Sequence, residues 1–400
     1  LRIGVSARLA KQALADFSGK DVLEIETLWH GLSPPYEPLF AWLEGKAERP
    51  ILATPAIFHS VMLANPVGEG DLENLDPADF AAEWKWDGIR VQMSSAGTTR
   101  RLYSRSGDDI SAAFPDVLDA INFSGVVDGE LLVGGTARMN SPTRTFSDLQ
   151  QRLNRKTVTA KMLEDFPAFV RAYDVLFDGE HDVRPETFST RRARLGRLIE
   201  KAPHDRFDLS PLVPFESWEA LEKIRRDPPD PVIEGVMIKR LDSPYQAGRL
   251  KGPWFKWKRD PFNIDAVMMY AQRGHGKRSS YYSDFTFGVW TAGPDGDMLV
   301  PVGKAYFGFT DAELDVLDRF VRNNTTERFG PVRAVRAEPA YGFVLEVAFE
   351  GINRSTRHKS GVAMRFPRIA RLRQDKLPAD ADRLETLMAM VEARESAAED

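Results

Sequence analysis

One short stretch restricts this chain more than any other: Glu83-Trp84-Lys85-Trp86-Asp87-Gly88-Ile89-Arg90. Its pattern predicts a strand, a tight turn and a second strand. Gly88 suits a turn that requires a positive φ, and Asp87 suits the position before it. Lys85 then ends a strand between two tryptophans, where it is either a surface charge lying on an aromatic ring or a nucleophile. The stretch alone leaves both readings open.

Length and composition describe a globular chain of several domains. Its 400 residues exceed what one core holds, and 42% hydrophobic with 28% charged residues is ordinary for a soluble protein. The absence of cysteine excludes disulfides and thiolate zinc sites and fits a reducing cytoplasm. No apolar run reaches membrane length and no signal peptide is present, so we expect a cytoplasmic protein with no membrane contact. The net charge of −5 argues against general coating of nucleic acid.

The chain changes texture twice, near Pro50 and near Asp260-Pro261. Before the first change the pattern predicts short helices, the first capped by Ser6. Between the changes it predicts helices at Thr145–Leu153 and Thr190–Lys201 among strands at Phe80–Trp86, Arg90–Met93, Arg100–Ser104, Ser124–Val133, Phe166–Phe177, Pro231–Lys239 and Trp254–Lys258.

The last region alternates short strands with one internal helix, Asp311–Val321, before a final helix from about Asp382. Five short strands and one helix predict a small barrel of the OB type. The expected fold class is therefore α+β, with antiparallel sheets and flanking helices followed by an OB-fold barrel. A hinge near Asp260-Pro261 is a further expectation.

Charged residues are embedded in several strongly apolar strands. Asp128 and Glu130 flank a glycine in Val126–Leu132, and Glu234 precedes a glycine in another apolar strand. Each charge alone is compatible with a strand edge. Together with Lys85 and the Lys256–Lys258 pair, the two glutamates predict a pocket for a polyanion and a hard cation such as Mg²⁺, because buried carboxylates need a partner.

These segments in this order resemble the successive motifs of the ATP-dependent DNA ligases, within the covalent nucleotidyltransferases. The segments are KWDGIR, SRSG, VVDGELLV, AYDVLF, EGVMIK, WFKWK and RFPRIARLRQDK, from Glu83 to Lys376. The resemblance implies an adenylation domain over 51–260 and an OB-fold domain with a C-terminal helix over 261–400. Residues 1–50 resemble the end of the helical DNA-binding domain of larger bacterial ligases of a damage-response type, and a further helical region before Leu1 is expected.

The resemblance implies a role for each matched residue. Lys85 attacks the α-phosphorus of ATP and carries AMP, Glu83 reads the adenine amino group, and Tyr173 stacks on the base. Mg²⁺ or Mn²⁺ is held by Glu130 and Glu234. The other nucleotide-binding positions are Arg90, Arg105, Lys239, Arg249, Lys256, Lys258, Arg365, Arg368 and Lys376.

Two points about these roles remain open at this stage. Mg²⁺, Lys256 and Lys258 opposite Lys85 are expected to disfavour its protonated form, against an ordinary lysine pKa of about 10.4. The family often has two adjacent basic residues ahead of the Lys256 strand, whereas Arg249 is followed by Leu250 and then Lys251. The sequence does not decide which side chain takes the second basic role.

The implied reaction seals nicks in double-stranded DNA, with a role in DNA repair. AMP passes from Lys85 to the 5′-phosphate, and the 3′-hydroxyl then attacks. We expect a monomer; any partner nuclease or helicase is not readable from the sequence. The alternatives are an mRNA-capping-type guanylyltransferase, an RNA ligase, and a non-catalytic DNA-binding protein on a ligase scaffold. An NAD-dependent ligase is disfavoured because its zinc module needs cysteines.

Overall fold

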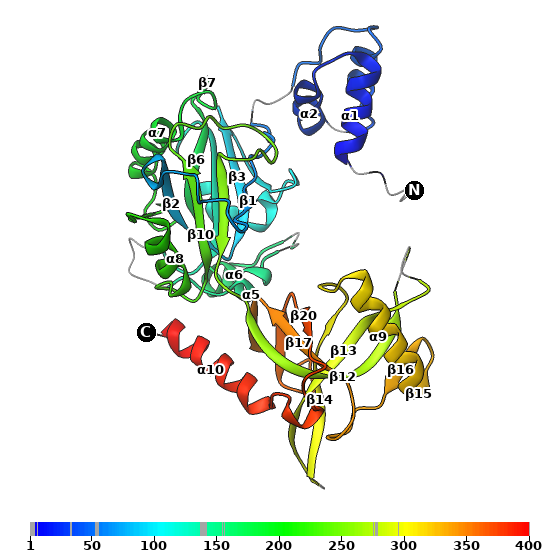
Figure 1. Cartoon of the computed structure of the whole chain (residues 1–400). Coiled ribbons are helices and arrows are strands. Elements are labelled where there is room, and N and C mark those ends of the chain that lie inside the picture. Colours follow the sequence, from blue (N-terminus) through cyan, green and yellow to red (C-terminus); the bar gives the residue numbers. More distant parts are fainter. Residues whose placement is uncertain are drawn as a thin grey trace. The chain divides into compact units, whose positions relative to one another are not determined.

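The computed structural model describes residues 5–399, except positions 6, 33, 53–55, 137–141, 154, 156, 275, 277–278 and 295 (Figure 1). The chain divides into two compact units, residues 1–259 and residues 260–400. This division coincides with the Asp260-Pro261 step, where the sequence changes texture. Within the described ranges, no helix is long and apolar enough to cross a membrane.

Helices form the N-terminal part of the first unit: α1 (Ala7–Ser18), α2 (Val22–Gly31) and α3 (Glu37–Leu43). Asp21 caps α2, because its side chain accepts a hydrogen bond from the Leu23 backbone N–H at 2.9 Å. The helices share a buried cluster of Ala15, Ile25, Leu28, Leu39, Trp42 and Leu43. The predicted helices are confirmed, whereas the proposed cap Ser6 lies outside the described residues.

Lys85 belongs to a five-stranded sheet with the order β1-β11-β10-β2-β9. The strands are β1 (Asn65–Pro66), β2 (Phe80–Trp86), β9 (Leu212–Val213), β10 (Ile233–Arg240) and β11 (Trp254–Lys258). Neighbouring strands are antiparallel except β1 and β11. Leu221 of α8 (Trp218–Arg226) joins Val236, Ile238 and Phe255 in one apolar core, which fixes this sheet against that helix.

A six-stranded sheet follows the order β4-β3-β5-β6-β7, with β8 parallel to β6. The strands are β3 (Ile89–Ala96), β4 (Thr99–Ser104), β5 (Gly125–Val133), β6 (Ala168–Asp178), β7 (His181–Asp182) and β8 (Phe207–Leu209). Its helices are α4 (Pro115–Ala120), α5 (Phe146–Gln150), α6 (Ala160–Asp165) and α7 (Phe188–Glu200). Leu195 and Ile199 of α7 pack into the core of this sheet.

The two sheets meet close to Lys85. The guanidinium of Arg171 on β6 lies 4.0 Å from the ring centroid of Trp86 on β2. The ammonium of Lys239 on β10 donates to the Tyr173 carbonyl on β6 at 3.3 Å. Side chains from both sheets therefore face one site.

The turn between β2 and β3 differs from the expectation at Gly88, which does not adopt a positive φ. A Cβ atom at Gly88 would lie 2.5 Å from the Leu131 carbonyl oxygen and 2.9 Å from Cγ of Glu130. Glycine is therefore required because the turn passes close to β5, the strand that carries Glu130.

The second unit is built on a seven-stranded sheet with the order β14-β13-β12-β16-β15, in which β17 pairs with β12 and β20. Its strands are β12 (Phe262–Arg273), β13 (Tyr282–Gly293), β14 (Gly296–Ala305), β15 (Thr325–Phe329), β16 (Val332–Val335), β17 (Val344–Phe349) and β20 (Arg368–Leu372). A separate hairpin pairs β18 (Gly351–Arg354) with β19 (Val362–Arg365). Helices α9 (Asp311–Asn324) and α10 (Leu384–Glu399) contribute Leu314, Leu317, Val321, Leu387 and Val391 to its core.

The α+β fold class is confirmed, with mostly antiparallel sheets and an OB-fold-like second unit. The predicted long strands and the helices at 190–201 and 311–321 are present. Sequence reasoning missed the short helices α4 and α6, the helix α8, and the strands β15, β18, β19 and β20. The strands and the helices α4 and α6 are short, so they carry a weak periodic signal, whereas α8 is strongly amphipathic and its pattern was overlooked.

Candidate active site

A β-bulge places the Glu234 side chain beside Lys85. In the pairing of β10 with β2, Gly235 lies opposite Lys85, and the register shifts between Ile233 and Gly235. Gly235 has a φ of +144°, and a Cβ atom there would lie 2.2 Å from the Trp257 carbonyl oxygen. The extra residue in the bulge re-aims its neighbour, so the Lys85 ammonium donates a hydrogen bond to the Glu234 carboxylate.

The pKa of Lys85 is raised by the protein's own groups. Burial of the ammonium opposes protonation, but the carboxylates of Glu234 and Glu130 outweigh it. The expected lowering of the Lys85 pKa depends on Mg²⁺ as well as on Lys256 and Lys258, and it stays a prediction for the protein with its metal bound.

Several cations lie near Lys85 and Glu234. Lys256 and Lys258 lie on one face of β11, and the Lys258 ammonium is 3.6 Å from the Glu234 carboxylate. The pKa of Lys256 is lowered, first by burial and then by the charges of Arg249, Lys85, Lys258 and Arg105. We call this group of cations the cationic end; its members are Lys85, Arg105, Arg249, Lys256 and Lys258.

Arg249, not Lys251, is the residue of its segment that acts electrostatically on Lys256. It lies between β10 and β11 with its side chain exposed. The exposed Arg105 reaches the same region from the turn after β4. Arg249 therefore lies among the charges that act on Lys256, and the residue that takes the second basic position near Leu250 stays undecided.

Glu130 lies on β5, opposite Arg90 of β3 and Arg171 of β6. Burial raises the pKa of its carboxyl group to about 7, against the lowering effects of Lys85 and Arg90. Among the described residues, no side chain forms an ion pair with this carboxylate within 4 Å. It is thus a partly buried acid without a direct cationic partner, which suits a ligand that brings its own positive charge.

Asp128, the other acid of the same strand, is fully buried and already satisfied. It accepts hydrogen bonds from Arg90 Nη2 at 2.5 Å, the Tyr245 hydroxyl at 2.6 Å and Gln92 Nε2 at 2.9 Å. Asp128 therefore finds its cationic partner within the protein, in Arg90, whereas Glu130 has no such partner in the described ranges. Arg90 also donates to the Met62 carbonyl at 2.6 Å, yet its buried Nε has no hydrogen-bond partner among the described residues.

Two residues before Lys85 on β2, Glu83 lies among buried ion pairs and is 1% exposed. Lys239 Nζ lies 2.5 Å from one carboxylate oxygen, and Arg192 Nη1 lies 2.5 Å from the other. Lys239, also 1% exposed, lies over the Tyr173 ring at 4.6 Å. We call Glu83, Tyr173, Arg192 and Lys239 the closed end.

Burial lowers the pKa of Lys239, although Glu83 and Asp174 favour its charged form. Its ammonium is thus committed to Glu83, and sequence reasoning did not foresee this pairing. Arg192 was missed altogether. The available signal was the pair of adjacent arginines on the predicted helix 190–201, where helical spacing turns part of the basic cluster inward.

Two other arginines of the first unit lie in the core rather than on a solvated face. Arg191 is fully buried and pairs with Asp174 at 2.8 Å, and Arg152 is fully buried and pairs with Asp116 at 2.5 Å. Both arginines therefore form ion pairs in the core of the first unit. A basic run in a sequence does not reveal which of its members have buried carboxylate partners.

The remaining predicted residues lie in the second unit, near its C-terminal strands. Arg368 pairs with Glu350 at 3.0 Å, and Lys376 pairs with Asp265 at 2.6 Å. The Arg365 guanidinium lies 5.3 Å from the ring centroid of the exposed Phe366. These cations gather on one segment of that unit.

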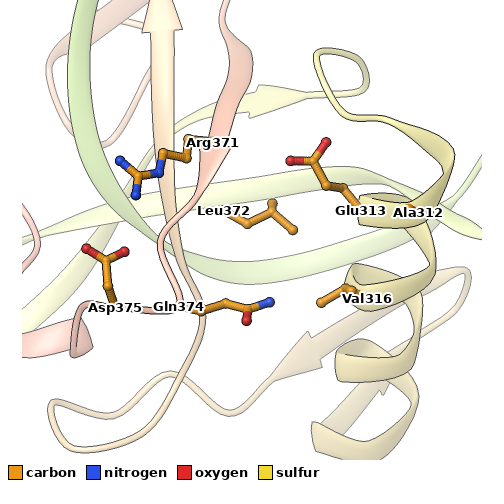
Figure 2. Close-up of a pocket in the computed structure, with 7 residues that line it drawn as sticks. All are labelled: Ala312, Glu313, Val316, Arg371, Leu372, Gln374 and Asp375. Atoms are coloured by element: carbon orange, nitrogen blue, oxygen red, sulfur yellow. The ribbon is translucent and has the colours of Figure 1, made fainter.

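A pocket of about 440 Å³ lies beside this segment, between α9 and the end of β20 (Figure 2). Its lining is Ala312, Glu313, Val316, Arg371, Leu372, Gln374 and Asp375. Glu313 is occupied as the capping-box partner of Thr310, and Asp375 is bonded to Arg373. The pocket contains none of the residues that the sequence assigned to nucleotide or metal.

Comparison with known proteins identifies the family. Residues 61–258 match the "ATP dependent DNA ligase domain", and residues 278–376 match the "ATP dependent DNA ligase C terminal region". The chain is 33% identical over 411 residues to a probable DNA ligase of Koribacter versatilis, covering 96% of this chain and 69% of that protein. It is 32% identical over 395 residues to DNA ligase 1 of Korarchaeum cryptofilum, covering 98% and 70%.

A solved structure of a Lig E DNA ligase supports the fold. It is 20% identical, with a TM-score of 0.53, and the match covers 79% of this chain and 100% of that chain. The two family matches and the two relatives show the family and its activity. The chain belongs to the ATP-dependent DNA ligases, the enzymes that seal nicks in duplex DNA with ATP.

Proposed function

We propose that Lys85 is the nucleophile of this ligase and that the pocket between the two sheets holds ATP. The neutral Lys85 amine attacks the α-phosphorus, a P–N bond forms, and the bond to pyrophosphate breaks. The observation that carries this proposal is the position of Lys85 between the carboxylates of Glu130 and Glu234 and the cations of β11. Such an arrangement suits a polyphosphate accompanied by a metal ion.

The cationic end is proposed to bind the phosphates. Lys256 and Lys258 are positioned by β11, while Arg105 and Arg249 approach from exposed segments. Fixed cations stabilise the charge that develops on the phosphoryl oxygens, and they need no reorganisation when the reaction occurs. Arg365, Arg368 and Lys376 are proposed to contact the pyrophosphate.

A divalent cation, Mg²⁺ or Mn²⁺, fits Glu130 and Glu234. No cluster of three or more histidine or acidic side chains suited to a metal occurs in the described part of the chain. Mg²⁺ is commonly held by one or two carboxylates together with substrate phosphates and water, so two glutamates suffice. When bound, the cation supplies positive charge to the phosphate oxygens. Neutralisation of the two carboxylates would also remove the main causes that raise the pKa of Lys85.

The closed end is proposed to bind adenine. Tyr173 offers an aromatic face, and Glu83 offers carboxylate oxygens that can accept a hydrogen bond from the amino group. Glu83 and Lys85 are two residues apart on β2, so their side chains leave the same face of the strand. The unpartnered Nε of Arg90 is a donor available to the ribose.

Further steps complete the proposed cycle. AMP passes from Lys85 to the 5′-phosphate of a nick, and the 3′-hydroxyl then attacks this activated phosphate and releases AMP. The helical residues 1–50 are proposed to belong to a DNA-binding domain, with adenylation assigned to 51–260 and the barrel to 261–400. Action as a monomer in the cytoplasm is part of this proposal; the absence of cysteine fits that compartment.

The decisive experiment incubates the protein with Mg²⁺ and ATP labelled at the α-phosphate. An acid-labile adduct that pyrophosphate reverses is expected, and peptide mapping should locate it at Lys85. Labelling by GTP in place of ATP would favour a capping-type guanylyltransferase. Transfer of the label to nicked duplex DNA, but not to nicked RNA, separates a DNA ligase from an RNA ligase.

A further inference from the structure

The proposed nucleotide site contains a partly buried cation that no matched motif assigns: Arg192 on α7. Its side chain is 13% exposed and approaches β2 from the helix, where Nη1 lies 2.5 Å from Glu83. Its Nη2 donates to the carbonyl oxygen of Ser210. Ser210 is itself buried and donates its backbone N–H to the Ala172 carbonyl of β6 at 2.8 Å. The Arg192 guanidinium is therefore held through Nη2 by the Ser210 carbonyl, while its Nη1 contacts Glu83.

The two oxygens of the Glu83 carboxylate have different partners. Lys239 holds one and Arg192 holds the other. The terminal torsion of a glutamate has a broad preference, so a contact on one oxygen leaves the carboxylate plane free to turn. A second contact on the other oxygen fixes that plane. A carboxylate has about four lone-pair positions, so two cations leave acceptor capacity for one more donor.

The chemistry of that donor follows from the surroundings. The Tyr173 ring, which has Lys239 at 4.6 Å and Arg90 at 5.7 Å from its centroid, is the aromatic group of this site, while the fixed carboxylate accepts hydrogen bonds only. A purine with an amino group at position 6 can donate to it. A purine with an oxygen there brings a second acceptor against a charge that the two cations keep in place.

We propose that Arg192 is a positioning residue that orients the Glu83 carboxylate and thereby selects adenine over other purines. This inference rests on the proposed function, in which Glu83 faces the base. Arg192 itself touches neither the base nor the reacting atoms; it acts through Glu83. Lys239 and Arg192 together make the orientation of Glu83 independent of whether a nucleotide is bound.

The test measures base selectivity, because a residue that only holds α7 against β2 would not affect it. Lysine adenylation is measured with ATP and with purine riboside 5′-triphosphate, which lacks the amino group. The wild-type protein should prefer ATP in kcat/KM by about tenfold, since the analogue cannot donate the hydrogen bond that the amino group gives to the charged Glu83 carboxylate. In Arg192→Gln this preference should fall to about threefold or less, mainly through a higher KM for ATP.

Arg197→Gln is the matched control, because Arg197 is an exposed arginine of the same helix and undergoes the same change. It should keep the wild-type preference. Arg192→Lys keeps the charge without the fork and should restore part of the preference; it carries the test if Arg192→Gln fails to fold. A folded Arg192→Gln that retains the wild-type preference would overturn the inference. Failure of the wild-type protein to form any lysine adduct would instead contradict the proposed function.

Discussion

The two ends of the pocket along β2 differ in how their charges are balanced. At the closed end, each oxygen of Glu83 has a cation at 2.5 Å, and the side chains are almost fully buried. At the cationic end, several cations lie together, and the pKa of Glu130 is raised to about 7. One end is complete without a ligand, whereas the other contains charges that a ligand would balance.

This difference matches the proposed chemistry of the two parts of ATP. Adenine is neutral, so a site for it must satisfy its own charges before the base arrives. The polyphosphate brings negative charge and a metal ion, so its site can retain cations and carboxylates that are unbalanced in the free protein. A residue at the closed end should therefore govern stability and base choice, and a residue at the cationic end should govern catalysis.

The largest effects on adenylation and stability should come from replacing the lysine at each end by methionine, in two separate variants. Lys85→Met should lower lysine adenylation by about 10⁴-fold or more, because the nucleophile is lost. Its effect on stability should stay within about 1 kcal/mol, since the Lys85–Glu234 pair is partly exposed. Lys239→Met should instead cost about 3 kcal/mol, because it breaks a buried pair.

Labelling with ATP and urea unfolding measure the two effects separately. If both variants lose the same stability, or if Lys85→Met still accepts label, the contrast between the ends is not real. Circular dichroism of each variant checks that the fold is retained.

The carboxylates should give the next largest effect. Glu130→Gln and Glu234→Gln should each reduce adenylation by about 100-fold and raise the Mg²⁺ concentration needed for half-maximal rate. Asp128→Asn on the same strand is the control, because its carboxylate already has three hydrogen-bond donors. It should mainly destabilise the fold, by about 2 kcal/mol. Adenylation rates of all three variants are measured as a function of Mg²⁺ concentration. A Mg²⁺ dependence that is unchanged in both glutamate variants would refute the metal assignment.

The sequence predicted the contents of the pocket better than its internal pairing. Lys85, Glu130, Glu234 and Lys256 are charges inside apolar strands, so sequence pattern alone marks them as unusual. Strand boundaries near them were also predicted, because β-branched and aromatic runs are bounded by glycine and proline. Cross-strand pairing brings these residues together, and one sequence contains no direct record of it.

What sequence reasoning missed has the same physical origin. Asp128 and Glu130 look alike in the sequence, but Asp128 meets Arg90, Gln92 and Tyr245, which come from distant segments. Gly88 suggested a positive φ, whereas its turn needs space against β5. Arg192 lies in a basic run whose other members include the core residue Arg191. In each case the deciding partner is far away in the chain.

Glu130 should also make stability depend on pH. Its pKa is raised from 4.5 to about 7 in the folded protein, so the folded state binds more protons than the unfolded state between these values. Its contribution to stability is fully present below pH 4.5 and is lost as the pH rises through 7. From pH 5 to pH 8 this loss should amount to about 2 kcal/mol without divalent cations.

Because other groups titrate in the same range, the useful quantity is the difference between the wild type and Glu130→Gln. The unfolding free energies of both proteins are measured at pH 5, 6, 7 and 8 in EDTA. Relative to Glu130→Gln, the wild type should lose about 2 kcal/mol of stability between pH 5 and pH 8. Parallel curves for the two proteins would therefore contradict an unbalanced carboxylate at the cationic end.

The smallest effect should separate Arg249 from Lys251, which the sequence could not rank for the second basic position. Both side chains are exposed, yet only Arg249 is among the charges that lower the pKa of Lys256. Arg249→Gln should raise the KM for ATP by about fivefold, because an exposed cation near the phosphates contributes about 1 kcal/mol and salt screens it. Lys251→Gln should change KM by less than about twofold. Adenylation kinetics at low and high salt measure both, and the gap between the variants should narrow at high salt. A larger effect from Lys251 would assign the second basic position to it and remove Arg249 from the cationic end.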